Sequence, residues 1–361
     1  MKILHVIPSF STAMGGPAIA LKNLCEGLSV LGVSQTIVTL YECDIEVAGV
    51  ETHEFKAKGK SYGVSKNLKK WLTEHLREFD LVQIHSIWLY HSYITSHLCQ
   101  KFKIPYVIRL CGMLDSWSMG QKALKKKIYF NLLEKKNIIQ AGAIHCTSET
   151  EVIDSGVKAW NSNVHVIANC IEKEYFAEEN CRSRNKQFLY LGRLHYKKQP
   201  DILIRAFSRF KKQDYKLILA GTGEPDYVDY LHKLAETCDG RVSFVGEVSG
   251  DNKIKLFQES AAFVLPSQQE NFGVAVAEAM TFGCIPIISN EVALSGVVEE
   301  SRVGIVTGID EESILSGLQK FTELEQGSVE NMRRQCMEIS RDSFHPENIA
   351  NKFLNLYKYL M

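Results

Sequence analysis

The sequence lacks several features that mark specialised classes of protein. It has no excess charge of either sign, because 42 Lys and Arg residues balance 42 Asp and Glu residues. Proline is scarce, with 8 residues in 361, and 45% of the residues are hydrophobic. The balanced charge argues against a chain whose whole surface binds nucleic acid, and the composition excludes disordered and collagen-like classes. At this length we expect about two domains.

Long hydrophobic runs and paired cysteines are also missing. The apolar run that follows Met1 is interrupted by His5 and is too short for a signal peptide, so it predicts a buried first strand. No stretch reaches the length of a membrane span. The 10 cysteines contain no CxxC pair, which argues against a zinc ribbon or a thioredoxin-like motif. We therefore expect reduced, buried thiols and a cytoplasmic protein.

Short apolar runs alternate with amphipathic segments, a rhythm that predicts parallel sheets covered by helices. In the first half we expect strands at 3–7, 35–39, 81–84, 106–109, 143–146 and 164–167. The helical patterns between them include 17–31, 65–77 and 121–139. In the second half we expect strands at 188–192, 216–220, 242–246, 262–265 and 285–288.

A polar stretch without periodicity, 172–186, separates the two halves and is typical of a domain boundary. The predicted fold class is therefore α/β, with two Rossmann-like doubly wound domains over 1–170 and 171–345. We expect 346–361 to form a C-terminal helix, and its return to the N-terminal domain is left open. In such sheets ligands bind beyond the carboxyl ends of strands, so the strand-to-helix junctions hold the candidate site residues.

Three of these junctions carry suitable residues. Gly15-Gly16-Pro17 follows the first strand, where glycines would let a backbone approach a phosphate and proline suits a first helical turn. Arg193 and Lys198 follow the strand that opens the second half and could neutralise charge on a departing pyrophosphate. Taken alone, the first motif also fits a structural turn and the second a solvated basic turn.

The third junction contains two glutamates eight residues apart, Glu270 in a loop and Glu278 in the helix that follows. Carboxylates would repel a pyrophosphate, so their plausible task is to accept hydrogen bonds from sugar hydroxyls. Backbone N–H groups at the same helix start could bind the phosphates. A simple preference for carboxylates at helix N-termini explains Glu270 alone but does not explain both.

Together these residues resemble the retaining glycosyltransferases of family four, also called group 1 transferases, whose GT-B fold has two Rossmann-like domains facing across a cleft. Its markers here also include Gly221-Thr222-Gly223 and Gly283-Cys284-Ile285-Pro286. The segment Cys111–Trp117 resembles one from bacterial polysaccharide-assembly members. The resemblance covers nearly the whole chain.

The resemblance implies a role for each matching residue. Arg193 and Lys198 would bind the donor pyrophosphate, Glu270 the donor sugar, and Glu278 the ribose hydroxyls. His85, at a strand end, matches a histidine near the sugar and phosphate, although a lone histidine is more often structural. The implied catalytic set is thus His85, Arg193, Lys198 and Glu270. The implied donor contacts add Gly15, Gly16, Gly221, Asn271, Phe272, Gly273 and Glu278, and no metal or cofactor is expected.

The chain departs from the family pattern at three places. Cys111 stands where histidine or arginine usually precedes the glycine, although Arg109 lies two residues earlier. Asn169-Cys170 replaces a common asparagine-glycine, and Gln199 replaces a glycine often found after the lysine. None of these changes removes a residue of the implied donor site.

The implied reaction moves a hexose or N-acetylhexosamine from a UDP- or GDP-sugar to an acceptor hydroxyl with retention, in bacterial surface polysaccharide assembly. A sugar-nucleotide epimerase of the same architecture and a catalytically inert nucleotide-sugar-binding protein are alternatives. A metal-dependent transferase of another fold would need a clustered acidic motif. Glu42, Asp44 and Glu46 alternate instead with apolar residues, which suggests an exposed strand edge.

One further segment bears on partners. The lysine-rich stretch 121–136 has an apolar stripe, and it could rest on anionic lipid and bring the enzyme to a lipid-linked saccharide acceptor. A helix packed on the sheet with a solvated lysine face explains it equally well. The expected location is thus cytoplasmic, with peripheral contact at the inner face of the cell membrane as a hypothesis, and no nucleic-acid partner.

Overall fold

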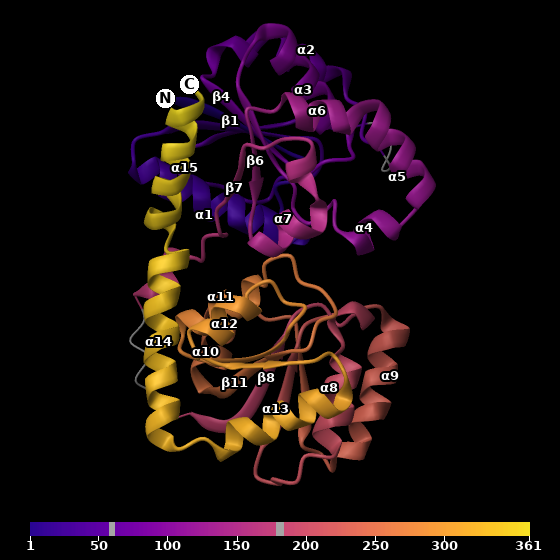
Figure 1. The fold of residues 1–361 in the computed structure, drawn as a ribbon, viewed down its shortest axis with the longest axis vertical. Coiled ribbons are helices and arrows are strands. Elements are labelled where there is room, and N and C mark those ends of the chain that lie inside the picture. Colours follow the sequence, from indigo (N-terminus) through magenta and orange to yellow (C-terminus); the bar gives the residue numbers. More distant parts are fainter. Residues whose placement is uncertain (58–61, 178–183) are drawn as a thin grey trace. The chain divides into compact units, whose positions relative to one another are not determined.

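The computed structural model describes residues 1–57, 62–177 and 184–361. The chain divides into two compact units. The first holds Met1–Cys170 and Pro346–Met361, and the second holds Ile171–His345. Each unit is a parallel sheet with helices around it (Figure 1), so the predicted α/β class with two doubly wound sheets is confirmed. No helix in the described ranges is both long enough and apolar enough to cross a membrane.

The sheet of the first unit consists of seven described strands in the order β3-β2-β1-β4-β5-β6-β7, all parallel. Their bounds are β1 Lys2–Ile7, β2 Ser34–Thr39, β3 Glu51–Glu54, β4 Leu81–His85, β5 Tyr106–Arg109, β6 Ala143–Cys146 and β7 Val164–Val166. The strand order reverses between β1 and β4. Such a switch point is where ligands bind in doubly wound sheets.

The helices of the first unit come from both ends of the chain. They are α1 Gly16–Val30, α2 Lys66–His75, α3 Tyr90–Phe102, α4 Ser116–Gly120, α5 Ala123–Tyr129, α6 Lys135–Gln140, α7 Glu149–Ser155 and α15 Pro346–Leu360. The C-terminal helix α15 packs along α1 (Figure 1). Gly27 permits this contact, because a Cβ there would lie 2.8 Å from the Pro346 carbonyl oxygen.

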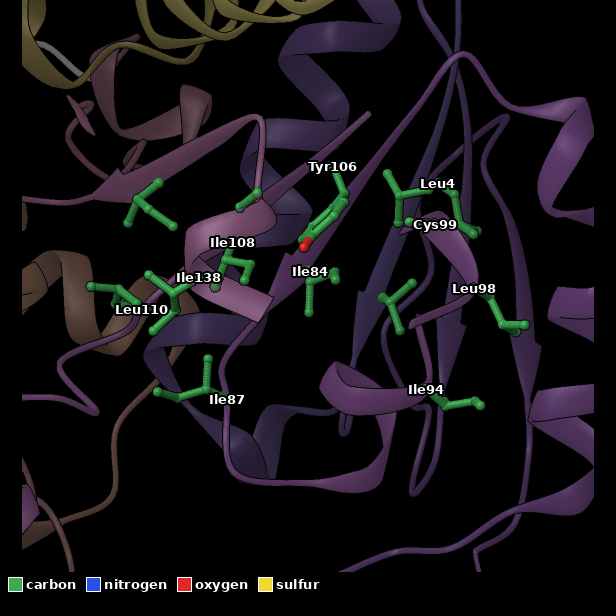
Figure 2. Close-up of a cluster of buried hydrophobic side chains, with 14 of the residues drawn as sticks. Leu4, Ile84, Ile87, Ile94, Leu98, Cys99, Tyr106, Ile108, Leu110 and Ile138 are labelled. Atoms are coloured by element: carbon green, nitrogen blue, oxygen red, sulfur yellow. The ribbon is translucent and has the colours of Figure 1, made fainter. Parts of the chain in front are cut away.

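The two faces of this first sheet differ in chemistry. One face is apolar, and Figure 2 shows its strand residues Leu4, Ile84 and Ile108 among buried side chains that include Leu98 of α3 and Ile138 of α6. The opposite face joins α1 and α15 through Ile3, Leu24, Phe353 and other apolar residues. Toward the carboxyl ends of its strands, however, that face carries buried histidine, glutamine and arginine side chains.

The sheet of the second unit has six described strands in the order β10-β9-β8-β11-β12-β13, again all parallel. Their bounds are β8 Asn185–Leu191, β9 Lys216–Ala220, β10 Val242–Gly246, β11 Ser260–Leu265, β12 Ile285–Ser289 and β13 Ile305–Thr307. The strand order reverses between β8 and β11. Both of these strands end at segments that the sequence marks as candidate site loops.

The helices of the second unit follow its strands. They are α8 Pro200–Ser208, α9 Pro225–Ala235, α10 Gly250–Glu259, α11 Val274–Thr281, α12 Ser295–Glu300, α13 Glu311–Glu323 and α14 Gln326–Phe344. Two short 3₁₀ helices also matter for the site, η5 Lys173–Phe176 and η6 Tyr196–Lys198. The predicted polar boundary 172–186 therefore contains η5 and the start of β8, and its residues 178–183 lie outside the described part of the chain.

Periodicity misses or misjudges three elements. Strand β3 is charged and lies at the sheet edge, so it has no apolar run, and β13 is only three residues long. The single helix predicted for 121–139 is wrong, because Lys122 adopts a left-handed φ of 55° before α5. A π-helical turn, η3 Phe130–Glu134, then separates α5 from α6. In this turn the Glu134 carboxylate is buried and accepts hydrogen bonds from the Trp88 amide (3.0 Å) and the Ser92 hydroxyl (2.8 Å).

Candidate active site

Two loops in the second unit are packed directly against each other by glycines. The Gly192 amide donates to the Ala220 carbonyl (3.0 Å) and the Leu194 amide to the Thr222 carbonyl (2.8 Å), which extends the pairing of β8 and β9 into their loops. A Cβ on Gly221 would lie 1.9 Å from the Gly192 carbonyl oxygen, and one on Gly223 would lie 2.1 Å from that of Leu194. These glycines therefore serve loop packing, and the donor contact expected of Gly221 stays a prediction.

The packed loops present Arg193 and Lys198 at the carboxyl edge of the sheet. Arg193 is exposed, and its carbonyl oxygen accepts from the Tyr190 hydroxyl (2.8 Å). Lys198 ends η6, and its Nζ is in direct contact with Oε1 of Glu270. Both side chains are largely buried, with 26% and 16% of their surface exposed. The structure thus brings together a cation and a carboxylate that are 72 positions apart in the sequence.

Glu270 is held by its backbone as well as by its side chain. Its amide donates to the Glu291 carbonyl (3.0 Å), and its carbonyl accepts from the Ala293 amide (3.0 Å), so the loop after β11 pairs with the loop after β12. The Ser267 hydroxyl donates to Oε1 of Glu270 at 3.2 Å. The carboxylate is therefore positioned before any ligand arrives, which is how binding sites limit the entropy lost on binding.

The charge state of Lys198 is finely balanced. Burial, reinforced by the Lys197 and Arg193 cations, lowers the pKa of Lys198 to about 7. The contact with Glu270 acts in the opposite direction, because a neighbouring carboxylate favours the ammonium form. An anionic ligand at this place would favour the ammonium form further. Lys198 is therefore suited to bind a pyrophosphate and to respond to its presence.

Gln199 has a backbone conformation that favours glycine, the residue that is common at this place in the family. It has a left-handed φ of 52° and precedes α8, a conformation that glycine adopts without strain. With its amide oriented to suit its neighbours, the Gln199 side chain donates to the carbonyl oxygens of Pro266 (2.7 Å) and Ile309 (2.9 Å). These bonds offset the strain and tie the loop after β8 to the loop after β11.

The second glutamate lies inside the helix that follows. Glu278 of α11 is buried, with 6% of its side chain exposed, and its Oε1 lies 2.6 Å from Nζ of Lys253 on α10. Burial raises the pKa of the Glu278 carboxyl, and the Lys253 cation lowers it. Sequence reasoning missed Lys253, because a lysine on another helix 25 residues away carries no local signal.

The segment Asn271–Gly273 begins α11. The Phe272 side chain is buried and packs edge-on against Phe344, with 5.6 Å between the ring centroids. It is a core residue, so only its backbone remains for the predicted donor contact. Gly273 precedes α11 with a left-handed φ of 88°, and the amides of the first turn of α11 follow it. This start of a helix provides the backbone donors that anionic groups require.

In the first unit the glycine turn is held by an acidic loop. Gly15 has a φ of 72°, and a Cβ built on it would meet nothing within 4 Å. The amide and the hydroxyl of Thr12 donate to the Asp44 carboxylate at 2.7 and 3.1 Å, and the Gly15 amide donates to the Thr12 carbonyl (3.0 Å). Asp44 thus holds this turn. Among the described residues, no cluster of His, Cys, Asp or Glu is arranged to hold a metal ion.

His85 ends β4 and is completely buried. Its Nε2 lies 3.2 Å from Nδ1 of His5, and Nε2 of His5 lies 3.2 Å from Oε1 of Gln35. Burial, followed by the charges of His5 and Arg109, lowers the pKa of His85 well below its usual range. The imidazole is therefore neutral at neutral pH and suited to donate a hydrogen bond. The sequence signals of this network are His85, which the family resemblance marks, and His5, which interrupts the apolar run of β1.

The loop after His85 is strained. Ser86 and Trp88 have left-handed φ values of 69° and 76°, which non-glycine residues adopt rarely. Trp88 is held there by two bonds, one from its amide to Glu134 (3.0 Å) and one from its indole nitrogen to the Met113 carbonyl (3.1 Å). These hydrogen bonds give the loop after β4 a defined conformation.

The predicted residues therefore form two groups. Each lies at the carboxyl ends of strands next to a switch point, where a doubly wound sheet binds its ligand. The first unit carries Gly15 and Gly16 after β1 and His85 at the end of β4. The second unit carries the rest after β8, β9 and β11, namely Arg193, Lys198, Gly221, Glu270, Asn271, Phe272, Gly273 and Glu278.

The two doubly wound sheets, with candidate site loops at the carboxyl ends of their strands, can be compared with known protein families. The family model described as "Glycosyl transferases group 1" matches residues 171–342, and "Glycosyl transferase 4-like domain" matches residues 15–170. The chain belongs to the group 1 glycosyltransferases, and it is a glycosyltransferase.

Individual relatives are distant but span nearly the whole chain. An uncharacterized glycosyltransferase of Methanocaldococcus jannaschii is 27% identical and covers 96% of this chain and 95% of its own. The GDP-mannose:cellobiosyl-diphosphopolyprenol alpha-mannosyltransferase of Xanthomonas campestris is 25% identical, over 86% of this chain and 84% of its own. The structure of Anabaena HepE in complex with UDP and glucose has a TM-score of 0.79 at 17% identity, covers 99% of each chain, and shows the shared GT-B fold.

Proposed function

We propose that this glycosyltransferase moves a hexose or N-acetylhexosamine from a UDP- or GDP-sugar to an acceptor hydroxyl, with retention of anomeric configuration. The observation that carries the proposal is the contact of Lys198 with Glu270 at the switch point of the second sheet. There a cation for the leaving phosphate and a carboxylate for sugar hydroxyls lie side by side. Neither an epimerase, which needs no acceptor, nor an inert binder accounts as well for the family to which the chain belongs.

The transfer develops negative charge on the departing phosphate and positive charge at the anomeric carbon. Lys198 and Arg193 meet the first of these charges, together with the backbone amides at the start of α11. Glu270 orients the sugar through its hydroxyls. We assign no protein nucleophile, because the family resemblance implies attack on the same face, with the leaving phosphate accepting the proton of the acceptor. On this proposal the enzyme works without a metal.

The acceptor is proposed to be a lipid-linked saccharide in bacterial surface polysaccharide assembly. The name of the Xanthomonas campestris relative describes transfer from GDP-mannose to a cellobiosyl-diphosphopolyprenol. A second relative is a D-rhamnosyltransferase of Pseudomonas aeruginosa. HepE was crystallised with UDP and glucose, so both nucleotides occur among related proteins and both are to be tested.

A panel of nucleotide sugars tests the reaction. Thermal-shift screening should identify the donor, because a ligand of the folded state raises its apparent stability. With that donor and a lipid-linked acceptor, NMR of the product should show the anomeric configuration of the donor. Formation of an epimer without acceptor would instead identify an epimerase, binding without transfer or donor hydrolysis would identify an inert binder, and an inverted product would refute retention.

The stretch 121–136 also supports contact with a membrane. Leu124, Ile128 and Leu132, at a helical spacing, are 74%, 53% and 71% exposed, which is unusual for a row of large apolar side chains. Exposed Lys125 and Lys127 flank them. We propose that this row inserts among lipids while the lysines contact anionic headgroups, which would place a cytoplasmic enzyme at the inner face of the membrane.

Flotation with liposomes containing anionic lipid tests this contact. Lys125→Glu with Lys127→Glu should abolish salt-sensitive binding, and Leu124→Ser with Ile128→Ser should weaken it at every salt concentration. The matched control is a double change to glutamate at exposed lysines of α2, Lys69 and Lys70, which makes the same change in charge elsewhere on the first unit. Equal flotation of all variants would refute the proposed membrane contact.

A further inference from the structure

Lys253 forms an ion pair that the proposed reaction does not use directly. It lies on α10, and its Nζ is 2.6 Å from Oε1 of Glu278 on α11. Only 18% of the Lys253 side chain and 6% of the Glu278 side chain are exposed. A nearly dry ion pair is costly to form, so its presence beside a proposed ligand contact requires an explanation.

Among the residues that the structure describes, Lys253 is the cation that acts on the Glu278 carboxyl. Burial raises the pKa of that carboxyl most, and the negative charge of Glu172 raises it further, whereas Lys253 lowers it. Tyr175 of η5 is buried and uncharged, and its ring centroid lies 5.9 Å from Lys253 Nζ. Tyr175 in turn packs on Phe282, with 5.0 Å between their ring centroids. The ammonium group is therefore seated against an aromatic ring as well as against Glu278.

The protonation state of Glu278 decides which hydrogen-bonding groups it can bind. An ionised carboxylate is only an acceptor, so it can receive hydrogen bonds from both hydroxyls of a ribose. A protonated carboxyl presents a donor where the diol also presents donors. Because Oε1 already accepts from Lys253, the ion pair also sets the direction in which Oε2 points.

We propose that Lys253 is a positioning residue of the donor site, which keeps Glu278 ionised and oriented for the ribose diol of the nucleotide. This rests on the proposed function, in which Glu278 contacts that ribose. Lys253 thereby acts on recognition of the nucleotide rather than on the chemical step at the anomeric carbon. Its loss should raise the KM for the donor and leave kcat nearly unchanged.

Calorimetric titration with UDP and GDP, and with their 2′-deoxy forms, tests the proposal at about pH 7 and pH 9. In Lys253→Met the affinity for the better ribonucleotide should fall roughly tenfold at pH 7. The loss should be smaller for the 2′-deoxy form, which keeps only one of the two hydroxyls. Relative to the wild type at the same pH, that loss should shrink at pH 9, because a buried carboxyl without a cation ionises only at higher pH.

Two further variants test whether the effect depends on the charge and the position of Lys253. Lys253→Arg keeps a cation and should retain most of the affinity. Lys255→Met removes a lysine from the same helix that is 63% exposed and lies 3.8 Å from Glu259, and it should leave affinity unchanged. Thermal unfolding checks that each variant is folded, and Lys253→Gln takes the place of Lys253→Met if the latter is not.

The outcomes separate the two proposals. If the wild type binds neither nucleotide, the proposed function is overturned, and the role of Lys253 falls with it. If the wild type binds but Lys253→Met loses affinity equally at both pH values and for both sugars, Lys253 is merely structural. An unchanged affinity in Lys253→Met also overturns its role, whereas a loss that is specific for ribose and relieved at pH 9 establishes it.

Discussion

Acid should selectively destabilise the first unit, because it buries histidines that cannot charge in place. Burial is the main cause in each case, and it lowers the pKa of His5 to about 4, that of His91 to about 4 and that of His145 to about 3. In the unfolded chain such histidines titrate near 6.5. Between these values the unfolded state binds more protons than the folded state, so stability falls as pH falls from about 6.5 toward 4.

His145 allows the magnitude to be worked out. With a folded pKa of about 3 against 6.5 unfolded, lowering the pH from 7 to 5 should cost about 2 kcal/mol through this one residue. His145→Gln cannot charge, and its amide can still donate toward the Ile167 carbonyl, which now lies 2.8 Å from His145 Nε2. The variant should therefore lose about 2 kcal/mol less than the wild type over this pH range, whatever its stability at pH 7.

The assay can observe this unit alone. All 4 tryptophans of the chain, at 71, 88, 117 and 160, lie in the first unit, so tryptophan fluorescence during urea unfolding reports on it. His97→Gln, at an exposed position of α3, is the matched control and should keep the wild-type pH dependence. An identical pH dependence in His145→Gln and the wild type would refute the argument that buried neutral histidines set acid stability.

Three further predictions concern the loops of the site. Gly221→Ala or Gly223→Ala should destabilise the second unit by at least ~2 kcal/mol, because a Cβ would lie 1.9 or 2.1 Å from a carbonyl oxygen; an unchanged circular dichroism melting curve would contradict this. Donor affinity should fall as pH rises through about 7, where Lys198 loses its charge. In Lys198→Arg, donor affinity measured by calorimetry should vary less with pH, because a guanidinium stays charged. A wild-type affinity that does not change with pH would count against the role of Lys198. Asp44→Ala should raise the donor KM several-fold, because Thr12 loses both of the hydrogen bonds to Asp44 that hold the Gly15 turn. An unchanged KM would show that this turn takes no part in donor binding.

Much of the fold follows from the sequence, because most of the buried parallel strands are short apolar runs. The strands at 106–109, 143–146, 216–220 and 242–246 have the predicted bounds. The charged edge strand β3 could not be found in this way, because one of its sides faces solvent. The break of 121–139 into α5, η3 and α6 depends on the burial of Glu134 against Trp88, a contact between residues 46 positions apart.

The candidate site was predictable only where residues share a motif. Arg193, Lys198, Glu270 and Glu278 stand at strand ends that the apolar runs locate, and the sheet order brings Lys198 and Glu270 together. Lys253 and Gln35 carry no such signal, because their roles arise from packing between separate elements. The burial of the Phe272 side chain likewise became apparent only from its contact with Phe344.

The proposed donor site is tested by the rate of sugar transfer in Glu270→Ala and Lys198→Ala, measured with a verified donor and acceptor. Each variant should lose roughly 100-fold or more in kcat/KM, because each removes a group that is proposed to contact the sugar or the leaving phosphate. Circular dichroism should show that both variants remain folded. Near-normal transfer by either folded variant would contradict the assignment of the donor site to the contact between Lys198 and Glu270.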